Sequence, residues 1–175
     1  MPVIRWPNER ADRYRNDHDL DCDPERYDTP ESTALRRDYY GEVAGRYWGR
    51  PATAREIDEG LADDGVELLA RPTGEFVVGR YGGTAAACAG LRVVDPGVAE
   101  LTRVYVRPAF RGTGGGGLLL ATAEAAARDL GVGRVRLDTR NDLVEARALY
   151  ARHGYDEVPA FNQGPYAEHW FAKSL

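Results

Sequence analysis

The fold of this chain is decided by the stretch Val104-Tyr105-Val106-Arg107-Pro108-Ala109-Phe110-Arg111-Gly112-Thr113-Gly114-Gly115-Gly116-Gly117-Leu118. It begins as an apolar strand, passes through a short turn with a proline and an arginine, and continues through a glycine run into a long helix rich in alanine and leucine. Glycine is a poor helix former, so glycines at the start of a helix need a physical reason. Two explanations stay open here: a flexible turn, or a cradle that binds an anion.

The anion cradle has a clear physical basis. Backbone without Cβ atoms can approach a ligand closely, and the first N–H groups of a helix are unpaired at the positive end of its dipole. Arg111 adds a fixed positive charge with five donors. A triphosphate site is disfavoured because Leu118 and Leu119 follow the glycines, where a P-loop has lysine and serine or threonine. A dinucleotide site is disfavoured because Asp138 lies too far along the chain.

Bulk composition limits the class of protein. The 175 residues suit one domain with a sizeable core, and 43% hydrophobic residues indicate a chain that folds. The net charge of −5 and the pI near 5.3 argue against nucleic acid or an anionic membrane as a partner. We find no apolar run of the roughly 20 residues that a membrane helix needs, no signal peptide, and too few cysteines for a disulfide framework or a cysteine-based zinc site. We therefore expect a cytoplasmic protein that uses no metal.

The order of predicted elements describes one α/β domain with a mixed sheet. Residues 1–28 are predicted to be an N-terminal arm with a possible short strand at 3–6, and residues 29–175 a single domain. Thr29-Pro30 starts a helix that runs to about Trp48, and the capping box Thr53-x-x-Glu56 opens a second helix. The remaining predictions are strands at 75–81, 84–94 and 98–106, a helix at 118–130, a strand at 132–139, a helix at 142–153, and strands at 155–158 and 169–174. Because the apolar residues of 98–106 do not alternate cleanly, we expect a β-bulge near Thr102-Arg103.

Two motifs in this order resemble those of the GNAT superfamily, the acetyl-CoA-dependent N-acetyltransferases. Arg111-x-x-Gly114-x-Gly116 is similar to the family's pyrophosphate-binding motif, and Ala146-x-x-Leu149-Tyr150-x-x-x-Gly154-Tyr155 to its Ala-x-x-Leu-Tyr-x-x-x-Gly-Phe signature. The resemblance covers residues 29–175, and the end of the chain looks like a bacterial branch with unassigned substrates. It implies a GNAT fold with a mixed, mostly antiparallel central sheet flanked by helices.

The resemblance also implies how acetyl-CoA is held. The strand before the turn would bind the pantetheine arm through its backbone, as an added strand does. The glycine run would bind the pyrophosphate. The family often has a CoA-binding asparagine at the position of Leu143, and Asn141, two residues earlier, is our candidate for that contact. The cofactor-binding residues are therefore predicted to be Val104, Tyr105, Val106, Arg111, Gly112, Thr113, Gly114, Gly115, Gly116, Gly117 and Asn141.

The implied reaction is direct attack of a primary amine on the thioester, with a backbone N–H near the strand bulge polarising the carbonyl oxygen. Tyr150 would donate a proton to the departing thiolate, or it is only a core aromatic. Glu100 would be the base, since it lies eleven residues before Arg111, where histone-modifying members have a glutamate; otherwise it is a solvated strand residue. His169 and His153 are weaker candidates for the base.

Three functions remain open at this stage. The first is N-acetylation of a small-molecule amine, with an acceptor site lined by Tyr39, Tyr40, Trp48, Glu100 and the loop 159–169. The second is a CoA-binding sensor or interaction domain without turnover. The third is acyl transfer to a protein amine, or transfer of a longer acyl group. Intact Tyr150 and Glu100 favour an enzyme, the acidic charge weakly favours a cationic acceptor, and homodimers are common in this fold.

Overall fold

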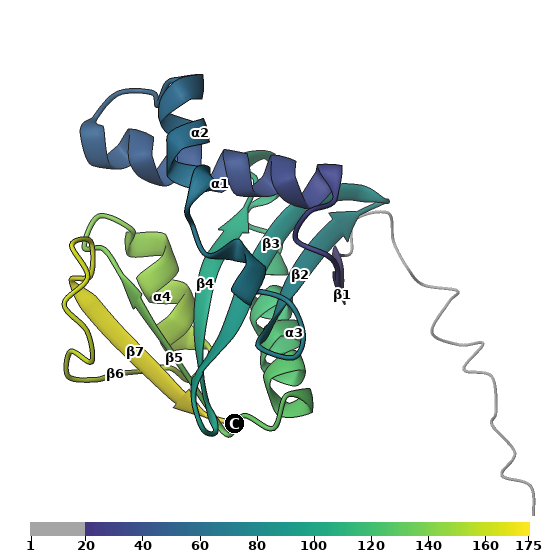
Figure 1. Cartoon of the computed structure of the whole chain (residues 1–175), viewed down its shortest axis with the longest axis vertical. Coiled ribbons are helices and arrows are strands. Elements are labelled where there is room, and N and C mark those ends of the chain that lie inside the picture. The colour runs from purple at the N-terminus through teal and green to yellow at the C-terminus, as the bar shows by residue number, and fades with distance from the viewer. Residues whose placement is uncertain (1–19) are drawn as a thin grey trace, which may run out of the picture.

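The computed structural model describes residues 20–175 of the chain (Figure 1). Its centre is a seven-stranded sheet in the order β1-β2-β3-β4-β5-β7-β6. The pair β4–β5 is parallel and the other five neighbouring pairs are antiparallel, so the sheet is mixed and mostly antiparallel as predicted. The strands are β1 Leu20–Pro24, β2 Gly74–Tyr81, β3 Thr84–Asp95, β4 Val98–Val106, β5 Arg134–Thr139, β6 Asp156–Glu157 and β7 His169–Ser174.

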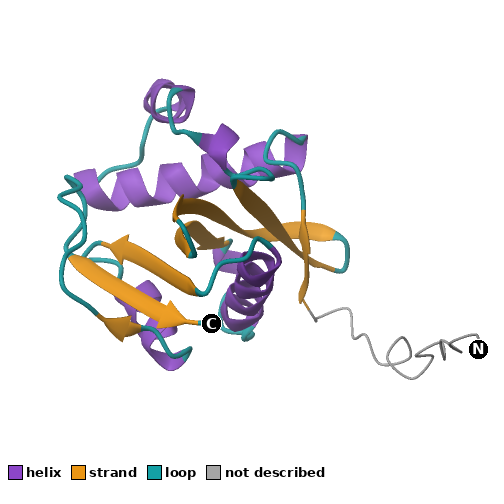
Figure 2. Cartoon of the chain, turned by 60° about the horizontal axis from the view of Figure 1, so that its bottom comes forward, coloured by secondary structure: helices purple, strands orange, loops and turns teal. Residues whose placement is uncertain are grey.

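Helices cover both faces of this sheet (Figure 2). Helices α1 and α2 lie over one face, and α3 and α4 lie over the other. Two short 3₁₀ helices, η2 and η3, lie before β2 and after β4. The bounds are α1 Pro30–Trp48, α2 Ala54–Ala62, η2 Val66–Leu68, η3 Pro108–Phe110, α3 Gly115–Asp129 and α4 Val144–Arg152.

Both N-terminal helices start where the sequence predicts. The Thr29 hydroxyl accepts a hydrogen bond from the Ser32 N–H at 3.1 Å, and Pro30 is the first residue of α1. At α2, the Glu56 carboxylate accepts from the Thr53 N–H at 2.8 Å and the Thr53 hydroxyl accepts from the Glu56 N–H at 3.3 Å. These bonds satisfy backbone N–H groups that have no partner inside a helix, so local sequence alone fixes where each helix begins.

The core consists of two layers, one on each side of the central strands. The larger layer packs α3 and Tyr150 of α4 against β3, β4 and β5. The smaller layer packs Leu35 of α1 and Leu69 against β2 and β3. Small residues on β3 permit this close packing: a Cβ added at Gly90 would lie 2.7 Å from a methyl carbon of Leu69.

Some boundaries differ from the prediction. Leu20–Pro24, placed in the arm by composition, forms the edge strand β1 and pairs with Val77–Tyr81 of β2. Its buried apolar residue is Leu20, at 6% exposure, which is too weak a pattern to predict a strand. The possible strand at 3–6 lies outside the described residues. Helix α3 begins at Gly115, so three glycines belong to its first turn. Among the described helices, none is long and apolar enough to cross a membrane.

The buried thiol of Cys88 gives a prediction for stability at high pH. Burial raises the pKa of this thiol from 9.0 to about 12. Between those two values the unfolded chain loses a proton that the folded chain keeps. The stability that this thiol contributes is therefore fully present below pH 9 and decreases as the pH rises above it. We expect the free energy of unfolding in urea to fall with pH in that range, by up to about 1.4 kcal/mol per pH unit from this group.

The variant Cys88→Ala isolates this contribution. Its stability should fall less steeply with pH than that of the wild type, because the buried tyrosines contribute equally to both chains. Parallel curves for the two proteins above pH 9 would contradict the assignment.

Candidate active site

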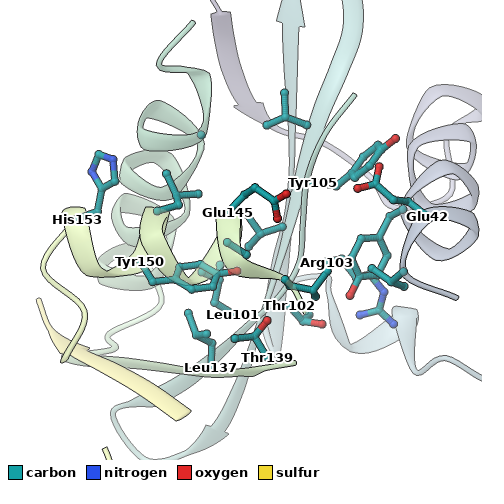
Figure 3. A pocket seen from close by; sticks show the side chains of 18 of the residues that line it. Glu42, Leu101, Thr102, Arg103, Tyr105, Leu137, Thr139, Glu145, Tyr150 and His153 are labelled. Atoms are coloured by element: carbon teal, nitrogen blue, oxygen red, sulfur yellow. The ribbon is translucent and has the colours of Figure 1, made fainter. Parts of the chain in front are cut away.

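Strands β4 and β5 separate partway along their length and open a groove between them. They pair only where Val98–Glu100 faces Arg134–Arg136, and beyond this point β4 continues without a partner strand on that side. The groove has a volume of about 840 Å³ and is lined by residues of α1, β4, the glycine run, β5 and α4 (Figure 3).

A bulge in β4 accompanies this separation. Arg103 has a φ of 53°, and the β3–β4 register shifts there, since Gly90 faces Thr102 while Cys88 faces Tyr105. The Arg103 guanidinium pairs with Asp64 at 3.2 Å, and Asp64 also pairs with Arg36 of α1 at 3.1 Å. All three side chains are nearly buried, so a compensated set of charges ties the loop after α2 and helix α1 to the bulge. The bulge predicted near Thr102-Arg103 is confirmed.

The predicted pantetheine-binding residues lie together on the part of β4 that has no partner strand on the β5 side. Val104, Tyr105 and Val106 all line it. The Tyr105 ring is buried edge-on against the ring of Tyr39, with 6.2 Å between centroids. Because β5 has diverged here, the strand can accept a further extended chain along this edge.

The glycine run closes one end of the groove. Gly112 and Gly114 have φ values of 79° and 84°, a region that costs other residues energy, and a Cβ at either would meet nothing within 4 Å. Gly116 and Gly117 are needed for close packing, because their Cβ atoms would lie 3.1 Å from Leu149 and 2.5 Å from the ring of His153. The start of α3 therefore lies against α4 with its first backbone N–H groups beside the groove.

Two predicted residues of this motif are held by protein contacts. Arg111 donates from Nε to the Val106 carbonyl at 2.7 Å and from Nη2 to Glu42 at 2.6 Å, which keeps its charge at the rim of the groove. Thr113 is not among the residues that line the groove. Its hydroxyl is hydrogen bonded to that of Tyr81 and donates to the Phe110 carbonyl at 3.1 Å, so its role is to fix the turn.

Tyr150 reaches the groove from helix α4. Its ring packs against Tyr155 and Phe171, each at 5.9 Å between centroids, and it is 6% exposed. Figure 3 shows it extending from α4 toward Leu101 and Thr102 of β4. Burial raises its pKa, and Tyr39 and Asp138 nearby add to this, so the phenol keeps its proton at neutral pH. Within residues 20–175 no group is hydrogen bonded to its hydroxyl, so the residue is a core aromatic whose protonated phenol also lines the groove.

Glu100 lines the groove, but arginines hold its carboxylate. Oε1 accepts from Arg136 at 3.0 Å and Oε2 accepts from Arg92 at 2.7 Å. To take a proton from a substrate, Glu100 would have to give up at least one of these ion pairs. The contacts are those of a residue that joins β3, β4 and β5, and they argue against the base role predicted for it.

Asn141 and His169 lie in a separate hydrogen-bond network outside the groove lining. The side-chain amide oxygen of Asn141 accepts from Arg147 at 3.1 Å and is 3.1 Å from His169 Nε2. The backbone N–H of Asn141 donates to Glu168 at 2.8 Å. His169 Nδ1 is 2.8 Å from Glu157. The structure therefore does not bring Asn141 together with the other predicted cofactor-binding residues.

A smaller side pocket of about 270 Å³ adjoins the groove. It brings together Tyr39, Tyr40 and Trp48, which the sequence analysis assigned to the acceptor site, and Tyr166 of the loop 159–169. It also contains residues that the sequence analysis did not single out for a site. These are Val43, Ala44, Tyr47, Asp138, Thr139, Arg140 and Leu143. A lone aspartate at the end of a strand carries no motif, so only the three-dimensional arrangement could find Asp138.

Comparison with known proteins agrees with this geometry. Residues 4–155 match the model of the acetyltransferase (GNAT) family. The chain belongs to the GNAT family. An IAA acetyltransferase of Azospirillum brasilense is 32% identical over 102 residues, which make up 58% of this chain and 65% of that protein. This GNAT chain thus covers somewhat less than two thirds of that relative's length.

Solved structures of other proteins have the same GNAT fold. One, from Klebsiella pneumoniae and assigned as an acyl-CoA N-acyltransferase, is 28% identical with a TM-score of 0.68, covering 90% of this chain and 99% of that chain. The PaiA N-acetyltransferase of Thermoplasma acidophilum, in complex with coenzyme A, is 17% identical with a TM-score of 0.69, again covering 90% and 99%. At that identity the second likeness shows the fold alone.

The glycine run yields a testable prediction. Gly114→Ala places a side chain at a φ of 84°, so it should cost about 1–2 kcal/mol and lower Tm by about 3–6 °C. The strain also distorts the cradle, so calorimetry should show CoA binding about tenfold or more weaker. Gly133→Ala is the matched control, because its Cβ would meet nothing within 4 Å and its backbone needs no positive φ. Equal CoA affinity in the two variants would contradict a cradle at Gly114.

Proposed function

We propose that this protein is an N-acetyltransferase that moves an acetyl group from acetyl-CoA to a primary amine of a small molecule by direct attack. The observation that carries the proposal is a single groove that combines an open strand edge, a glycine-rich helix start and a buried, protonated phenol. Family membership supports the same reaction class, and the name of the Azospirillum relative, an IAA acetyltransferase, supports acetyl transfer.

The residues of the groove fit coenzyme A. Gly112 and Gly114 leave open space in front of the backbone, and the first N–H groups of α3 with Arg111 at the rim favour a pyrophosphate. Val104–Val106 would hold the pantetheine arm by backbone hydrogen bonds along the edge that β5 leaves free. When bound, acetyl-CoA supplies the acetyl thioester, and backbone N–H groups near the bulge would polarise its carbonyl oxygen.

Tyr150 is the proposed general acid. Its hydroxyl faces the groove, is engaged by no described group, and stays protonated because burial raises its pKa. It would donate its proton to the sulfur of the departing thiolate. A domain that only senses CoA has no need of such a donor, so Tyr150 is the feature that favours turnover over the sensor alternative.

The proposal is tested by mixing the protein with acetyl-CoA and a panel of primary amines and reading the release of free thiol. Amine-dependent release is expected. Tyr150→Phe keeps the ring packing and removes the hydroxyl, so its kcat should fall about 100-fold while CoA affinity stays unchanged. An undiminished rate in Tyr150→Phe would remove the acid assignment.

Glu100→Gln is measured in the same series. Because both carboxylate oxygens of Glu100 are held by arginines, we expect its kcat to change by less than about threefold. A loss of about 100-fold or more would restore Glu100 as the base. Clear CoA binding in the calorimeter without release on any amine would favour the sensor alternative instead.

A further inference from the structure

The side pocket adjoins the groove. They share five lining residues, which come from α1, β5 and the start of α4: Tyr39, Val43, Asp138, Thr139 and Leu143. Tyr150 lines the groove, and the charge of Asp138 contributes to its raised pKa, so the two side chains are electrostatic neighbours across this junction. A molecule whose reactive end lies near Tyr150 can therefore extend its other end into the side pocket.

Five of the eleven residues that line the side pocket are aromatic. Helix α1 contributes Tyr39, Tyr40, Tyr47 and Trp48, and the loop before β7 contributes Tyr166. The rings of Tyr47 and Tyr166 meet edge-on at 5.1 Å. Flat apolar walls of this kind favour a ring or another compact apolar group through burial and edge or stacking contacts. At about 270 Å³ the pocket lies near the lower end of the range for small-molecule sites, roughly 300–1,000 Å³.

A cation is disfavoured as the group that fills the side pocket. Arg140 already places its guanidinium 5.4 Å from the centroid of the Tyr47 ring. This guanidinium is held in the wall, since it donates twice to Asp142 at 2.8 Å and once to the Val43 carbonyl at 2.8 Å. A second cation would have to compete with Arg140 for the Tyr47 ring, so the aromatic wall suits an uncharged group.

Asp138 differs from the other carboxylates that line the groove. Glu42, Asp64, Glu100 and Glu145 are each paired with at least one arginine. Within residues 20–175 Asp138 has no such pair: its Oδ2 accepts from the Asn162 amide at 2.7 Å, and its Oδ1 accepts no hydrogen bond. It is also the one carboxylate that lines both cavities in the described chain. An uncompensated negative charge at the junction is complementary to the ammonium form of an incoming amine.

We propose that the acceptor is an arylalkylamine, whose nitrogen is held by Asp138 at the junction and whose ring fills the aromatic side pocket. This inference rests on the proposed acetyltransferase function and names its substrate class. Asp138 positions the nitrogen toward the groove, and the ammonium releases a proton to solvent to give the neutral amine that attacks the thioester. The distance from Asp138 to the aromatic wall selects the length of the amine. Polyamines lack a ring for the pocket, and an amino acid would bring its carboxylate close to that of Asp138.

The experiment compares kcat/KM for four acceptors with acetyl-CoA saturating: 2-phenylethylamine, n-butylamine, spermidine and phenylalanine. We expect kcat/KM for 2-phenylethylamine to exceed that for each of the others by about tenfold or more, because burial of its ring stabilises the bound state. Asp138→Asn keeps an acceptor for the Asn162 amide and removes the charge, so kcat/KM for 2-phenylethylamine should fall about 30-fold with CoA affinity unchanged. Asp156→Asn, an exposed carboxylate on β6, is the matched control and should behave as the wild type.

The ring pocket is tested by Trp48→Ala and Tyr166→Ala, two exposed side chains at 41% and 55% whose loss should not disturb the core. Each should raise KM for 2-phenylethylamine about fivefold and leave that for n-butylamine within about twofold. Leu68→Ala, also exposed at 40%, is the control. If these residues acted only in folding, each substitution would change KM for both amines equally.

The outcomes separate this inference from the proposed function. Preference for spermidine or phenylalanine, or pocket variants that affect every amine alike, would overturn the arylalkylamine assignment and leave the acetyltransferase intact. Absence of thiol release with all four amines, together with CoA binding in the calorimeter, would overturn both.

Discussion

The site depends on a single constraint, which is that β4 pairs with β5 along only part of its length. Three residues of each strand are in register, and then the strands diverge at the bulge around Arg103. A positive φ at an arginine is costly, and it persists here because the Arg103 side chain is held in a nearly buried set of charges with Asp64 and Arg36. The free strand edge, the groove and the route from Tyr150 to the side pocket all follow from this divergence.

The two faces of the sheet contribute different residues to this opening. The face with α3 and α4 supplies the glycine-rich helix start and Tyr150, where we propose that the acetyl donor binds. The face with α1 and α2 supplies the aromatic wall, and β5 presents Asp138 beside it, where we propose that the acceptor binds. Among the carboxylates that line the groove in the described residues, Asp138 alone has no arginine partner, and we propose that it binds the incoming nitrogen.

The sequence placed most of the residues of the groove around the glycine run and Tyr150, and fewer of those in the side pocket. Glycines at a helix start and a tyrosine in the following helix are local patterns, so Arg111–Gly117 and Tyr150 could be placed together before the fold was known. The apolar residues after Leu101 do not alternate with polar ones, and this pattern likewise predicted the bulge. The arginine partners of Glu100 come from neighbouring strands, and Asp138 meets the tyrosines of α1 only through the tertiary fold, so no spacing in the sequence reveals either. Strand β1 was missed because its pairing with β2 stabilises a stretch of weak apolar pattern.

Hydrogen exchange with and without CoA tests whether the free edge of β4 and the start of α3 bind CoA. If the free edge of β4 and the start of α3 bind the pantetheine and pyrophosphate, amides of residues 101–106 and 112–117 should exchange more slowly when CoA is added. Amides of α2, which contributes no residue to the groove lining, should be unchanged. Unchanged exchange in 101–106 and 112–117 at saturating CoA would contradict the account.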